Sequence, residues 1–227
     1  MNAVLREAPP SDAELIDAAP ESDAGPPADA MVDGGGSDFG LVDGGADASL
    51  DAGQPRRMFA TGGGWQGGLS GTSSEPMSGI AAADRLCNAI AVELSLGGPS
   101  WRAWLSDSVE GDAVDRMVGE GPWVNMAGET VFPDRNALKN AAPLATLAYN
   151  EMGMRITSGA TTPSGHLGFW TGTAPGGAST SDTCIDWTTS FNTSSGTVGD
   201  LASNATNWSA IEVLPCTTGM RILCVEQ

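Results

Sequence analysis

SGIAAADRLCNAIAVELSLGG, at residues 78–98, predicts one amphipathic helix near the start of the folded part of the chain. Its apolar residues recur at spacings of three and four, which places them on one face of a helix: they are Ile80, Ala83, Cys87, Ile90 and Leu94. Ser78 is a favourable N-cap, and Gly97-Gly98 ends the pattern. Because Cys87 lies on the apolar stripe, we expect its sulfur to face the core.

Around this helix the pattern changes to short apolar segments separated by turns. These segments predict strands at 58–60, 101–105, 123–125, 130–132, 167–172, 183–188, 210–213 and 220–225. A second, short helix is expected at 136–144. Two helices followed by a set of short strands predict an α+β fold.

The chain before this region has a different composition. Residues 1–55 hold 12 acidic residues against one basic residue, and they contain no Trp, Tyr or Cys. Such a segment buries too little apolar surface to offset its ordering entropy, so we expect 1–56 to be a disordered acidic spacer. Residues 57–227 are then the folded domain. The first residues have no apolar stretch of the kind that a signal peptide needs, so we expect an export signal that precedes the given start or has been removed.

Four cysteines allow three pairings. Cys184 and Cys216 flank a stretch rich in Thr, Ser, Asn and Gly, which a disulfide would close at its base. Cys87 on the helix and Cys224 in the last strand would tie together the two ends of the domain. We therefore predict the nested pairing, Cys87 with Cys224 and Cys184 with Cys216. Disulfides place the domain in an oxidising compartment, outside the cell or on its surface.

Several motifs, taken in order, resemble the C-type lectin-like fold, most closely its endostatin branch and related bacterial surface domains. The motifs are Leu69–Gly71, Gly79–Cys87, Trp101–Ser106, Val124–Asn125, Val131–Pro133, Phe169–Thr173, Cys184–Trp187 and Ile222–Glu226. The resemblance covers about 58–227. It implies mixed, mainly antiparallel short strands, two helices and the same nested disulfides.

Known ligands of these relatives do not carry over. Residues 56–227 hold 16 acidic residues against nine basic ones, so heparin and nucleic acids should be repelled. His166 is the only histidine, which leaves no histidine-rich zinc site. The calcium triplets of lectins are also missing, because Glu75-Pro76-Met77 lies before the helix and Asn207-Trp208-Ser209 lacks the second carboxylate. We expect no metal and no cofactor.

Seven tryptophans are available for core packing or for ligand contact. Trp101, Trp104, Trp170 and Trp187 lie in strand patterns and are expected in the core. Trp65 and Trp208 lie in polar loops and are the candidates for an exposed contact. The amides Asn204 and Asn207, close to Trp208, complete the predicted set of ligand-binding residues.

Other polar residues give weaker signals. Asp107, Glu110, Asp112 and Asp115 do not match a calcium loop, since its glycine and final glutamate are absent, and they predict a solvated helix start. His166 is expected in a loop without a catalytic role, because no cysteine remains as a nucleophile.

The domain is thus predicted to be a non-enzymatic extracellular binding or adhesion module on a flexible spacer, for an unidentified protein or glycan but not heparin or nucleic acid. Secretion or display at the cell surface, as for a lipoprotein, is expected, with no direct membrane insertion because no apolar run is long enough. The alternative is a secreted hydrolase or metal-dependent enzyme with an unrecognised carboxylate site.

Overall fold

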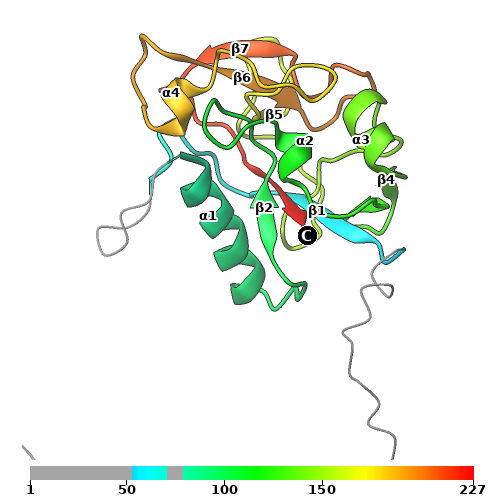
Figure 1. The fold of residues 1–227 in the computed structure, drawn as a ribbon. Coiled ribbons are helices and arrows are strands. Elements are labelled where there is room, and N and C mark those ends of the chain that lie inside the picture. The colour runs from blue at the N-terminus through cyan, green and yellow to red at the C-terminus, as the bar shows by residue number, and fades with distance from the viewer. Residues whose placement is uncertain (1–52, 71–78) are drawn as a thin grey trace, which may run out of the picture. The chain divides into compact units, whose positions relative to one another are not determined.

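The computed structural model describes residues 53–70 and 79–227 (Figure 1). Residues 1–52 of the predicted acidic spacer and the predicted N-cap Ser78 lie outside these residues. Within them the fold is α+β, as predicted, with four helices where the sequence pattern indicated two. The first strand begins at Arg56, one residue before the predicted start of the domain.

Short elements make up the described chain. The helices are α1 (Gly79–Glu93), α2 (Ala113–Arg116), α3 (Arg135–Asn140) and α4 (Cys184–Trp187). The strands are β1 (Arg56–Ala60), β2 (Trp101–Ala103), β3 (Trp123–Asn125), β4 (Thr130–Phe132), β5 (Gly168–Trp170), β6 (Ser195–Asp200), β7 (Glu212–Pro215) and β8 (Leu223–Glu226). Most predicted strands have a counterpart, and α3 corresponds to the predicted second helix.

Five strands form the first sheet, in the order β2-β8-β1-β3-β4. The pair β1–β3 is parallel and the other pairs are antiparallel. The first and last strands are therefore neighbours, and Arg57 links them further through two hydrogen bonds of 2.7 Å to the carboxylate of Glu226. These bonds raise the pKa of Arg57 above its ordinary value, although burial opposes them.

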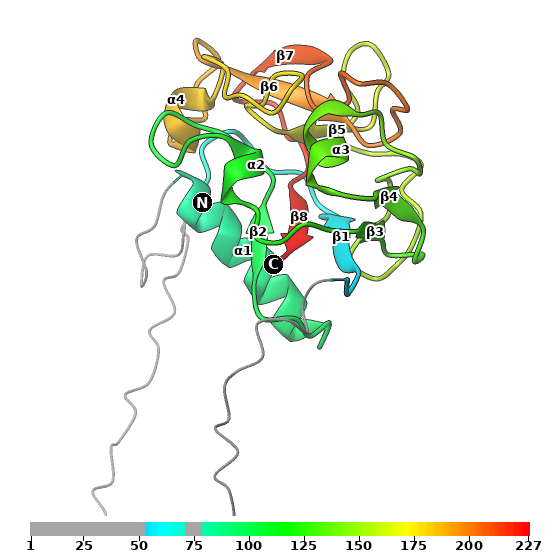
Figure 2. The ribbon, with the colours of Figure 1, turned by 45° about the vertical axis from the view of Figure 1, so that its right-hand side comes forward.

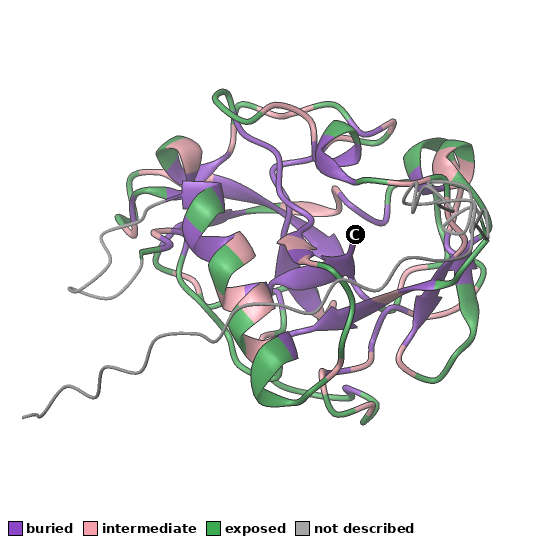
Figure 3. Cartoon of the chain, turned by 60° about the horizontal axis from the view of Figure 1, so that its bottom comes forward, coloured by how far each residue is buried: buried purple, intermediate pink, exposed green. Residues whose placement is uncertain are grey.

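Successive side chains of β1 point to opposite faces of this sheet, and apolar residues are buried on both faces. Phe59 packs on the face that α1 covers, together with Trp101 and Cys87. Met58 and Ala60 point to the opposite face, because successive side chains in a strand alternate. The predicted core tryptophans Trp101, Trp104, Trp170 and Trp187 are all buried. Figure 3 shows this burial, with buried strands inside and exposed residues along the outer side of α1.

Helix α1 buries nearly the predicted face, but toward its C-terminal end the buried position shifts by one residue. Ile80, Ala83 and Cys87 are buried as expected, but the next buried position is Ala91. Ile90 is half-buried and Leu94 is exposed beyond the helix end at Glu93. The disulfides Cys87–Cys224 and Cys184–Cys216 confirm the nested pairing, and the described chain has no free cysteine.

Helix α1 lies beside the edge strand β2 (Figures 1 and 2), and its side chains complete the hydrogen bonding of that strand. The side-chain amide of Asn88 accepts from the Trp101 N–H at 2.9 Å and donates to the Trp101 carbonyl at 2.6 Å. Asp84 Oδ1 accepts from the Ala103 N–H at 2.8 Å. The helix therefore takes the place of a further strand, which protects an edge that would otherwise offer free backbone groups.

The second sheet has the order β5-β6-β7 and is antiparallel throughout. Its central strand β6 was not predicted, because its sequence SGTVGD is polar and lacks apolar alternation. Its glycines explain how it is buried. A Cβ on Gly196 would lie 2.7 Å from the Trp170 ring, and one on Gly199 would lie 2.5 Å from the Phe169 ring. Only glycine lets β6 approach these aromatic rings.

The predicted strand at 183–188 is wrong, since these residues form the single turn α4. Cys184, Ile185, Asp186 and Trp187 have positive φ values of 51°, 53°, 50° and 59°. The turn is thus left-handed, a conformation that costs each L-residue roughly 1–2 kcal/mol. The surrounding contacts hold it in place: the Trp187 indole donates to the Ser106 carbonyl, and Cys184 is in a disulfide.

Replacement of Asn88 by Ala should lower the free energy of unfolding by about 2–4 kcal/mol, because it leaves two buried backbone groups of Trp101 without partners. The matched control is Asn140→Ala, which removes only an exposed amide pair with Asn136 on α3. Urea unfolding of the domain measures both variants, and equal stabilities would contradict the edge-covering role of Asn88.

Replacement of Gly199 by Ala should destabilise the domain by about 1–3 kcal/mol, because the new methyl group overpacks the contact with Phe169. Gly63→Ala is the control, since a Cβ there meets no atom within 4 Å. Thermal unfolding monitored by near-UV circular dichroism reports both changes. A Gly199→Ala variant as stable as Gly63→Ala would argue against β6 as a packed central strand.

Candidate functional site

A cavity of about 340 Å³ lies between α1 and the segment that leads from β1 toward it. Its lining residues are Trp65, Gln66, Gly68, Leu69, Ser70, Ala82, Ala83, Arg85, Leu86 and Ala89. We call it the Trp65 pocket. Its floor is apolar and its polar groups are few, which is the usual composition of a ligand site.

Backbone hydrogen bonds fix the segment that carries Trp65. Trp65 and Met220 exchange N–H to carbonyl bonds of 2.7 and 2.9 Å, and the Trp170 indole donates to the Trp65 carbonyl. Gly67 N–H donates to the Cys216 carbonyl at 2.8 Å. Because none of these bonds uses the Trp65 side chain, the indole is not needed to hold the segment, and 41% of the residue stays exposed.

Glycine at two positions lets this segment lie against the second disulfide. A Cβ on Gly67 would collide with the Cys184 sulfur, and one on Gly68 would lie 2.5 Å from the Ser190 hydroxyl. Leu69, which follows, donates to the Trp187 carbonyl at 2.8 Å. The Cys184–Cys216 bridge thus supports one wall of the pocket.

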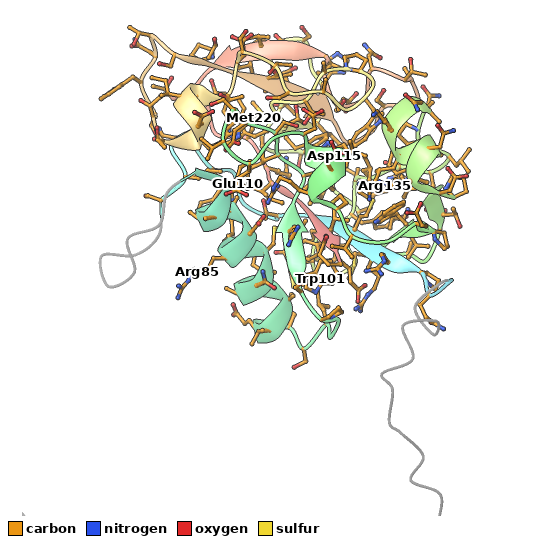
Figure 4. The ribbon with its side chains drawn as sticks, viewed as in Figure 1. Arg85, Trp101, Glu110, Asp115, Arg135 and Met220 are labelled. Carbon is orange, nitrogen blue, oxygen red and sulfur yellow. A yellow bond between two sulfur atoms is a disulfide. The ribbon has the colours of Figure 1, made fainter. Side chains whose placement is uncertain are left out.

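Mostly apolar residues of α1 form the other wall. Ala82, Leu86 and Ala89 recur at spacings of four and three, so they share one helix face beside the buried stripe. This second stripe is the signal that could have located the pocket from the sequence. Arg85 belongs to the same lining and projects from the outer side of the helix in Figure 4.

The structure separates the four predicted ligand-binding residues. Trp65 lines the pocket and is exposed, as expected. Asn204 and Asn207 are exposed too, but they lie between β6 and β7 and do not line it. Trp208 is only 2% exposed, so its prediction as an exposed contact is wrong.

Aromatic packing explains the burial of Trp208. Its ring lies 5.1 to 6.0 Å, between centroids, from the rings of Trp104, Phe132 and Phe169. Polar neighbours in the sequence suggested a surface loop, but the loop folds back so that the Trp208 carbonyl accepts from the Asp200 N–H. Trp208 is therefore a core residue.

The acidic cluster at 107–115 has mixed environments. Helix α2 does begin within it, after Asp112, and Asp115 lies 3.7 Å from Arg135 (Figure 4). Asp107, however, is buried and accepts from the N–H groups of Val109 and Glu110, which shows that it stabilises a turn. The expectation of a wholly solvated helix start is wrong for Asp107.

His166 lies in a loop, as predicted, and its Nδ1 is 2.9 Å from the buried carboxylate of Asp200. Asp200 also accepts from the Ala202 N–H, so the pair orders the loops around β6. In residues 53–70 and 79–227, no group of three or more His, Cys, Asp or Glu is placed to hold a metal ion.

Comparison with protein-family models and with curated proteins finds no match to this chain. The functional interpretation therefore depends on the geometry of the described residues.

Replacement by Ala of Trp208 and of Trp65 should lower the stability of the domain by very different amounts. Trp208→Ala leaves a large cavity among aromatic rings and should cost about 3–5 kcal/mol of stability. Trp65→Ala removes a half-exposed ring from a backbone-held segment and should cost less than about 1 kcal/mol. Chemical denaturation of both variants, with the wild type as reference, measures the difference. Similar losses would contradict the assignment of Trp208 to the core.

Proposed function

We propose that residues 56–227 form a non-enzymatic extracellular binding module of the C-type lectin-like, endostatin-like type, and that its ligand binds in the Trp65 pocket. One observation carries the proposal: Trp65 is the single exposed tryptophan among the described residues, and it lies at a cavity with a rigid frame. Exposed aromatic rings in pockets are typical anchors for ligands.

The nested disulfides and the α+β arrangement support the lectin-like assignment, because the resemblance of the ordered motifs implied both. The two disulfides also favour an oxidising environment, in agreement with secretion or surface display. No helix in the described part of the chain is long and apolar enough to cross a membrane.

The chemistry of the pocket favours a ligand with an apolar face and some polar edge groups. Trp65 and Leu86 offer apolar surface, while Gln66 and Ser70 add hydrogen-bonding groups. A sugar ring and an apolar side chain of a protein both meet this description. The volume of the cavity is suited to one such group.

Electrostatics disfavours sulfated glycans as ligands. Nine basic residues face 16 acidic ones in 56–227. Several arginines are engaged within the fold: Arg57 with Glu226, Arg116 with Asp84, and Arg221 with the carbonyls of Ser158 and Gly159. Burial lowers the pKa of Arg221, although Glu151 opposes the shift. Heparin, which needs several available cations, should therefore not bind at physiological salt.

An array of glycans and extracellular matrix proteins, probed with and without calcium, tests the proposal. We expect at least one retained ligand, no heparin retention at about 0.15 M salt, and a loss of tenfold or more in affinity for Trp65→Ala. Trp65→Phe is the control, because it keeps an aromatic ring at the pocket. A ligand that Trp65→Ala binds as well as the wild type would place the site elsewhere, and turnover of an array component would favour an enzyme.

A further inference from the structure

The left-handed turn α4 presents an apolar side chain to solvent beside a second exposed apolar residue. Ser108 donates to both carboxylate oxygens of Asp186, from its N–H at 2.9 Å and from its hydroxyl at 2.8 Å. The chain neighbours of this bonded pair are Val109, 76% exposed, and Ile185, 64% exposed. We call Val109, Glu110, Ile185 and Asp186 the Val109–Ile185 surface.

Ile185 has an unfavourable backbone conformation, and its side chain is not buried. A β-branched residue with positive φ is a genuine outlier, since its side chain crowds the backbone. Its exposure means that burial of apolar surface does not compensate for this strain. Strained residues that persist in a structure are concentrated at binding and catalytic sites, where the strain is retained for function.

Neighbouring residues, and not Ile185, hold the turn in place. Cys184 is in a disulfide, and the Trp187 ring is buried with its indole bonded to Ser106. Thr183 Oγ1 accepts from the Asp186 N–H at 3.2 Å. The side chain of Ile185 therefore contributes little to folding, and its position is dictated by the residues on either side.

The two segments that supply this surface carry side-chain charge of one sign. Neither 103–115 nor 156–220, the segments that supply it, contains Lys or Arg, and together they hold eight carboxylates. Glu110 is exposed on the loop that approaches α4 (Figure 4). A second copy of the chain would bring the same carboxylates and be repelled, whereas a basic partner would be attracted.

We propose that the Val109–Ile185 surface binds a protein segment in which an apolar residue is flanked by Lys or Arg. The apolar residue packs between Val109 and Ile185, and a flanking cation pairs with the exposed carboxylate of Glu110. This surface shares no residue with the Trp65 pocket, so the inference goes beyond the proposed function and does not depend on it.

Selection from a displayed library of random 12-residue peptides tests the inference. The wild-type domain is the bait, and peptides are kept if they bind Trp65→Ala equally well, which excludes ligands of the Trp65 pocket. We expect the kept peptides to contain an apolar residue next to Lys or Arg, and their affinity to fall as salt is raised.

The decisive variant is Ile185→Asn, because asparagine tolerates positive φ and removes the apolar group. We expect it to bind the selected peptides at least tenfold more weakly than the wild type, with an unfolding temperature equal to or above that of the wild type. Leu144→Asn, at another exposed apolar position, is the matched control and should bind normally. No enriched peptide, enrichment without basic residues, or equal binding by Ile185→Asn would each overturn the inference.

Discussion

Strand β8 is the element on which the described structure depends. It pairs with β1 on one side and with β2 on the other, and its Cys224 is bonded to Cys87 of α1. Strands of three to six residues are not stable alone, so each needs a neighbour and a covered face. By joining the first strand, the edge strand and the long helix, β8 brings together segments that are distant in the sequence, and its side chains contribute to the hydrophobic clusters on both faces of the sheet.

The two disulfides stabilise different parts of the domain. Cys87–Cys224 is buried within the first sheet and its helix, whereas Cys184–Cys216 anchors the turn that exposes Ile185 and lies against Gly67 beside the Trp65 pocket. Both candidate binding surfaces are therefore supported by the same bridge. Rigid support of this kind reduces the entropy that a loop loses on binding, which favours affinity.

The roles of polar and charged side chains in this domain depend on where they lie. Asp84 and Asn88 replace a strand at the sheet edge, where polar side chains on a helix usually indicate a solvent-facing surface. The segments that carry Val109 and Ile185 lack any Lys or Arg. An excess of acidic side chains suits recognition of basic partners better than self-association.

The sequence by itself determined the α+β class, the helix at α1 and four of the core tryptophans, and it favoured the nested disulfides among three pairings, because these features depend on apolar periodicity and on cysteine position along the chain. Only the tertiary structure decided the burial of Trp208, the strand β6 and the left-handed turn at Cys184–Trp187. Each of these is set by distant partners: aromatic rings around Trp208, Trp170 and Phe169 against the glycines of β6, and a disulfide at the turn. Local sequence patterns do not reveal such contacts, so at these positions tertiary packing outweighed the local conformational propensity of the residues.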